Sequence, residues 1–313
     1  MLSNFFVALS AVVPLFCLIF IGVLVKRYQL LTDLELNHVN RMVFRVFFSV
    51  MMFFNLYTAD FDNAIHPELI IFGAVGVFAI FAISMLLVCH FEPENKRRGA
   101  MVQAIFRSNF VLMGVPIVGN IFGDEALAVP VMMIAIIVPM YNVLSVIALE
   151  TFRGGRIAFV PIFRGILKNP MILGALAAGF ARLIGLYVPA IVLKPLGQVA
   201  AATTPIALII LGASFHAHGT GLHRPQLWIC VFAKLILVPI IVLGLAAFLG
   251  FRDVDFVTLV AIFGTPCAVA GFAMAQQMGS DAELAGNCVI ITSGFSCFTI
   301  FGLIFCAKSF GLF

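Results

Sequence analysis

Charged residues are scarce in this sequence. Of its 313 residues, 18 are Lys or Arg and 14 are Asp or Glu, so 10% are charged, whereas about 25% is usual in soluble domains. Hydrophobic residues make up 63% of the chain, and a soluble fold of this size could not cover that much apolar surface. The composition therefore predicts an all-α integral membrane protein. The small excess of positive charge falls in short loops and does not indicate nucleic-acid binding.

The motifs of most enzyme classes are lacking as well. The seven cysteines lie within apolar stretches at no metal-ligand spacing and are typical of small core residues. The sequence has no nucleotide-binding motif and no Ser/His/Asp or His/Glu set within its apolar runs. No Asp or Glu lies in the middle of a predicted span, which argues against a cation pump that works through midplane carboxylates. We expect neither an enzyme nor a bound cofactor or metal.

The apolar runs leave room for about ten membrane-spanning helices, since each needs about 20 predominantly apolar residues. Basic residues cluster in alternate connections, as at 26–27, 96–98 and 153–168. By the positive-inside rule these connections are cytoplasmic, and both termini lie outside the cytoplasmic (inner) membrane. The predicted spans are 5–25, 37–57, 68–89, 100–122, 126–149, 169–186, 197–215, 225–249, 256–278 and 283–307.

The two halves of the sequence resemble each other at an offset of about 157 residues. Gly114 recurs as Gly271, and residues 123–128 resemble residues 280–285. Because each half holds an odd number of spans, the second half enters the membrane from the opposite side, which is the inverted repeat of many secondary transporters. The expected units are a first repeat over 1–150, a cytoplasmic linker over 151–168 and a second repeat over 169–313.

Two spans carry a proline between glycines near the expected midplane, Pro116 in the fourth and Pro266 in the ninth. Proline supplies no backbone N–H and its ring clashes with the carbonyl four residues earlier, so each is expected to interrupt its helix. Broken backbone at this depth must face protein or water, and the half-helix that follows presents N–H groups and a positive dipole end to an anion. The alternative is an ordinary kink. The register differs, since at the repeat offset Asn109 corresponds to Pro266.

Two basic residues lie deep in predicted spans, Arg107 and Lys234. An arginine at the membrane centre costs about 2.5–3.5 kcal/mol and should face the bundle interior or water. Because Arg107 lies two residues before Asn109, it suggests an anion-attracting role on the cytoplasmic approach. The sequence favours equally a second interpretation, in which the side chain of Arg107 reaches the lipid headgroups. For Lys234 we expect structural pairing or packing rather than contact with the substrate.

Three motifs stand out along the whole chain: Asn109-x4-Gly114-x-Pro116, Thr204-Pro205 followed by Gly212, and Thr265-Pro266 running on to Gln276. Together they resemble the auxin efflux carrier family, whose bacterial members include malate and malonate permeases and whose plant members export the carboxylate auxin. The resemblance implies that helices four and nine are broken, cross at their prolines and hold the substrate carboxylate near that crossover. The candidate substrate-binding residues are Arg107, Asn109, Gly114, Pro116, Thr265, Pro266 and Gly271.

The resemblance also implies an elevator motion in a homodimer. Spans one, two, six and seven would form a dimerising scaffold, and spans three to five and eight to ten would carry the site. The expected function is secondary transport of a small organic anion, a mono- or dicarboxylate such as malate or malonate. The chain departs from the plant pattern at Gly271, where plant members carry a second proline, and at Arg107, which has no plant counterpart. The alternative is a membrane-embedded sensor that binds the anion without moving it.

Overall fold

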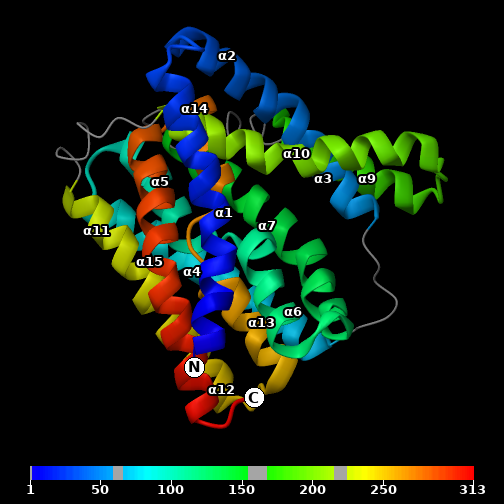
Figure 1. The fold of residues 1–313 in the computed structure, drawn as a ribbon, viewed down its shortest axis with the longest axis vertical. Helices are drawn as coiled ribbons and strands as arrows, with labels where there is room; N and C mark the ends of the chain where they lie inside the picture. Colours follow the sequence, from blue (N-terminus) through cyan, green and yellow to red (C-terminus); the bar gives the residue numbers. More distant parts are fainter. Residues whose placement is uncertain (1, 59–65, 154–167, 215–223) are drawn as a thin grey trace.

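The computed structural model describes residues 2–58, 66–153, 168–214 and 224–313 (Figure 1). All regular structure in these ranges is helical, and the nearest approach to a strand is one antiparallel bridge between Ser108 and Cys267. This confirms the all-α class. Six helices of the described ranges are long and apolar enough to cross a membrane: Asp33–Tyr57, Pro67–Phe91, Glu125–Arg153, Ala190–Ser214, Pro225–Phe248 and Ala282–Ser309.

Helical segments occupy each interval in which the sequence predicted a span, although only six meet the criterion of length and apolarity. That all ten cross the membrane stays a prediction, and most of the predicted linker lies outside the described residues. The segments are α1 (Leu2–Arg27), α2 (Asp33–Met42), η1 (Val43–Phe47), α3 (Phe48–Tyr57), α4 (Pro67–Phe91), α5 (Asn95–Phe106), η2 (Phe110–Gly114), α6 (Val115–Phe122), η3 (Asp124–Leu127), α7 (Ala128–Arg153), α9 (Pro170–Leu183), α10 (Ala190–Ser214), α11 (Arg224–Phe232), η5 (Ala233–Leu237), α12 (Val238–Phe248), α13 (Asp253–Phe263), α14 (Val269–Gln277) and α15 (Ala282–Ser309).

One group of helices packs through small residues. At the crossing of α1 and α10, a Cβ on Gly22 would lie 2.0 Å from the carbonyl oxygen of Ile209, and one on Gly212 would lie 2.0 Å from that of Ile19. Only glycine permits so close an approach of two backbones. Helix α3 packs against both α9 and α10 (Figure 1). Helices α1, α3, α9 and α10 thus lie together, as the predicted scaffold spans would.

Helix α2 and η1 belong with this first group, since α10 contacts both. The other helices form a second group around α5, α7, α13 and α15. The loops that connect these helices contact one another at both ends of the group. At one end, the carbonyl oxygen of Lys96 accepts hydrogen bonds from Asp281 N at 3.0 Å and from Ser280 Oγ at 2.7 Å. At the other end, His66 Nδ1 lies 2.9 Å from Asp255 Oδ2. Helix α1 begins and α15 ends near this second end (Figure 1). The connections predicted to share a side of the membrane therefore lie together.

Candidate functional site

Two helices stop near the centre of the second group and resume a few residues later. Helix α5 ends at Phe106 and η2 begins at Phe110, while α13 ends at Phe263 and α14 begins at Val269. The two non-helical stretches meet, because Asn109 N donates to the carbonyl oxygen of Pro266 at 2.8 Å. Since lipid offers no hydrogen-bond partner, backbone groups freed at this depth must be satisfied by the protein or by water.

The interruption in the fourth predicted span lies earlier than the sequence suggested. Pro116 was expected to cause it, but the non-helical residues are 107–109 and Pro116 lies in the first turn of α6. Because α6 continues the π-helical turn η2 without a break, Pro116 lies inside the helix Phe110–Phe122 and does not interrupt it. The preceding turn is also wide, with Val115 N donating to the carbonyl oxygen of Phe110. In the ninth predicted span, Pro266 lies within the interruption.

A cavity of about 80 Å³ lies against the meeting point, between the two interrupted helices on one side and α3 and α10 on the other. Both resumed helices begin at its wall, and neither Asn109 nor Ala268 caps its helix with a side chain. The residues that line the cavity are Phe48, Met51, Asn55, Arg107, Ser108, Asn109, Phe110, Val111, Leu112, Val138, Tyr141, Thr204, Ala268, Val269 and Ala270.

The side chain of Asn109 is the unusual feature of this cavity. Asn109 is only 6% exposed, and its Nδ2 has no hydrogen-bond partner among the described residues. A buried donor without a partner costs about 1–3 kcal/mol and needs an explanation. An amide NH2 can donate two hydrogen bonds, and a carboxylate accepts them. A residue of the cavity lining therefore carries a donor without a partner among the described residues, which an anion bound beside it could satisfy.

Two buried cations flank the meeting point. Arg107 is 5% exposed and donates to Asn142 Oδ1 at 2.6 Å and to Ser145 Oγ at 3.2 Å. Lys234 is fully buried and donates to Ser108 Oγ. Neither forms an ion pair within the described part of the chain. Buried charges with only neutral partners leave the surroundings at positive potential. Arg107 thus points into the bundle and not to the lipid headgroups.

The other predicted site residues lie away from this cavity. Thr265 is buried and its Oγ1 donates to the carbonyl oxygen of Ala261 at 2.8 Å, near the end of α13. Gly114 allows close packing, since a Cβ there would lie 2.7 Å from Cβ of Ala261. Pro116 lines a second, mostly apolar cavity of about 310 Å³ beside α1 and α10, which adjoins the first at Leu112 and Thr204. Gly271 lines a small space next to the side chain of Gln103.

Sequence reasoning therefore named Arg107, Asn109 and Pro266, which meet here, and missed Ser108 and the place of Lys234. The sequence does contain a pattern that could have indicated Ser108 and Lys234. Residues 107–109 are three polar residues in succession within an apolar run, and Lys234 is the one charged residue between 225 and 248. A charged residue within a membrane span costs free energy, so it is by default a candidate for a functional residue.

Comparison with known proteins identifies the family of the chain. The family described as "Membrane transport protein" matches residues 7–158 and 156–304. The chain belongs to this membrane transport family. The match confirms the resemblance to the auxin efflux carriers and a multi-pass membrane transporter. The chain is 24% identical over 306 residues to a "Putative malonate transporter" of Rhizobium meliloti, covering 95% of each chain. It is 21% identical over 295 residues to an "Uncharacterized transporter" of Methanothermobacter thermautotrophicus, covering 91% of this chain and 93% of the relative.

Proposed function

We propose that this membrane transport protein is a secondary transporter of a small organic anion, a mono- or dicarboxylate such as malate or malonate. The observation that carries the proposal is Asn109, a residue of the cavity lining whose buried Nδ2 has no partner among the described residues. A carboxylate accepts hydrogen bonds and does not donate them, so it complements such a donor.

Three further features favour an anion at this place. The first turn of α14 lies in the cavity wall without a side-chain cap, and helix N-termini attract anions through free N–H groups and the helix dipole. The first turn of the helix Phe110–Phe122 lines the same cavity. Arg107 and Lys234 add positive charge that no described acidic residue neutralises. A dianion would gain more from this field than a monoanion.

The position of the cavity suggests how the anion moves. Its wall combines residues 107–112 and 268–270 of the interrupted helices with Phe48, Met51 and Thr204 of α3 and α10. We propose that α1, α3, α9 and α10 belong to a fixed scaffold of a homodimer, and that the other group slides past it as an elevator. In this proposal ten segments form two inverted repeats, spans four and nine are the broken ones, and both termini lie outside the cytoplasmic membrane.

Transport into liposomes tests the proposal. We expect saturable uptake of labelled malonate or malate by the wild-type protein, and loss of most uptake in Asn109→Ala. The matched control is Asn120→Ala, the same substitution at an exposed residue of α6. Saturable binding without flux would favour the sensor, and absence of both would overturn the proposal. Full uptake by Asn109→Ala would remove this residue from the site.

A further inference from the structure

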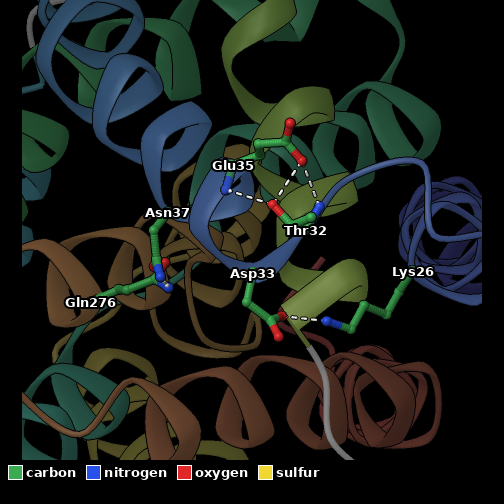
Figure 2. A network of polar contacts seen from close by, with 6 residues as sticks. All are labelled: Lys26, Thr32, Asp33, Glu35, Asn37 and Gln276. Atoms are coloured by element: carbon green, nitrogen blue, oxygen red, sulfur yellow. Dashed lines mark hydrogen bonds and ion pairs between the residues drawn. The ribbon is translucent and has the colours of Figure 1, made fainter.

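A cluster of amide side chains joins α2 to the end of α14 that lies farthest from the cavity. Gln276 Nε2 donates to Asn37 Oδ1 at 2.8 Å, and Asn40 Nδ2 donates to Gln276 Oε1. Figure 2 shows Gln276 reaching from α14 to Asn37 on α2. Asn40 is fully buried, whereas Asn37 is exposed. Both polar ends of the Gln276 amide are thus bonded to one helix of the other group.

Helix α2 is itself held firmly at its start. Thr32 and Glu35 form a capping box, in which Thr32 N donates to Glu35 Oε2 at 2.7 Å and Glu35 N donates to Thr32 Oγ1 at 3.3 Å. Lys26 at the end of α1 forms an ion pair with Asp33 (Figure 2). A capping box fixes the first turn of a helix. The helix that receives Gln276 has a fixed first turn and itself packs against α10.

The amide cluster and the cavity lie at different heights along the same helices. The first turn of α14 lines the cavity, and Gln276 is near the last residue of that helix. Helices α2, η1 and α3 form one continuous helical run, with Asn40 in its first half and Asn55 of the cavity wall near its end. The wall residues of this run extend from Phe48 to Asn55, so at a rise of 1.5 Å per residue they lie about 12 to 22 Å beyond Asn40 along it. The cluster thus joins the two groups only on one side of the cavity.

We propose that Asn37, Asn40 and Gln276 form a gate that closes the α2 end of the substrate path. This inference rests on the proposed transport function. In the conformation described, the gate holds the end of α14 against α2, while the cavity lies toward the Asn55 end. For the anion to leave past α2, the end of α14 must separate from it and both hydrogen bonds must break. The gate therefore stabilises one of the two access states and leaves the other unaffected.

A change that acts on one access state shifts the balance between the two states. We expect Gln276→Leu to raise the KM for malonate applied at the Asn55 end several-fold and to lower the KM at the α2 end by a similar factor. The measurement compares right-side-out with inside-out membrane vesicles. Loss of a merely structural contact would lower the maximal rate and leave the ratio of the two KM values unchanged, and that result would overturn the gate.

Three variants sharpen this test. Gln277→Leu, the adjacent residue of α14, should keep the wild-type KM ratio. Asn37→Asp keeps an acceptor for Gln276 Nε2 and should also keep the ratio. Asn37→Leu removes that acceptor at an exposed position, where misfolding is not expected, and should shift the ratio as Gln276→Leu does. An Asn37→Leu variant with the wild-type ratio would count against the gate.

Hydrogen exchange separates failure of the gate from failure of the proposed function. Without substrate, Gln276→Leu should exchange faster than Gln277→Leu in residues 33–42 and in the last turn of α14, because these segments then separate more often. Equal exchange in the two variants would overturn the gate even if transport is confirmed. Absence of organic-anion transport by the wild-type protein would overturn the transport proposal, and faster exchange would still support a latch between α2 and α14.

Discussion

Replacing Asn109 by alanine should separate substrate binding from folding. Asn109 lines the cavity, and its buried Nδ2 has no partner among the described residues. A hydrogen bond to a charged group contributes about 1.5–3 kcal/mol. At about 1.4 kcal/mol per tenfold change, Asn109→Ala should weaken the affinity for a carboxylate by about 10- to 150-fold. The KM of uptake should rise accordingly where binding is fast.

The same substitution should have little effect on the substrate-free protein. Nδ2 of Asn109 makes no hydrogen bond that Asn109→Ala would lose, and the substitution removes a buried donor that has no partner among the described residues. The midpoint of thermal unfolding without substrate should therefore stay within about 4 °C of the wild type. The rise of that midpoint on adding malonate or malate should largely disappear, because a ligand stabilises the folded state in proportion to its affinity.

Thermal unfolding with and without malonate, together with uptake into liposomes, checks both parts of this prediction. Asn120→Ala serves again as the exposed control on α6. The reasoning would be refuted if Asn109→Ala lowered the midpoint of the substrate-free protein strongly and kept the malonate-induced rise. Asn109 would then be a structural residue of the meeting point between the interrupted helices.

Three other predictions concern charge and packing. Arg107→Gln should raise the KM for divalent anions more than for monovalent ones, because a buried positive charge attracts a dianion more strongly; equal effects on both in an uptake assay would contradict this. Lys234→Met removes a buried charge that only a hydroxyl satisfies, so thermal unfolding should show unchanged or higher stability while malonate affinity falls; lower stability with unchanged affinity would speak against it. Gly212→Ala should destabilise the protein by about 1–3 kcal/mol, because its Cβ would lie 2.0 Å from the carbonyl oxygen of Ile19. Gly244→Ala, which meets no atom within 4 Å, should not destabilise it; equal unfolding midpoints for the two variants would refute the close crossing of α1 and α10.

The helical membrane fold could be predicted from the sequence, because scarce charge and long apolar runs leave few other structures in a bilayer. Asn109 and Arg107 could also be found, since polar residues within apolar runs are conspicuous. The place of the interruption could not be read from Pro116, because a proline can lie inside a helix without ending it, here directly after the wide turn η2. What ends α5 is a partner distant in sequence, the carbonyl oxygen of Pro266 that accepts from Asn109 N.

The contact between Asn40 and Gln276 was equally out of reach. The two residues are 236 positions apart, and neither stands out in composition from other amides near helix ends. Only the packing of α14 against α2 brings them together. Lys234 was expected to have a structural role in pairing or packing, because it lies deep in its predicted span. Lys234 contacts Ser108, which lies in the non-helical stretch next to Arg107, and this contact appears only in three dimensions.

The central claim is that an organic anion binds at the cavity where the two interrupted helices meet. An experimental structure of the protein with bound malonate tests it most directly. We predict density for the anion in the cavity, with a carboxylate oxygen within hydrogen-bond distance of Asn109 Nδ2 and close to the first turn of α14. Density for the anion at another place, in a preparation that transports malonate, would contradict the account.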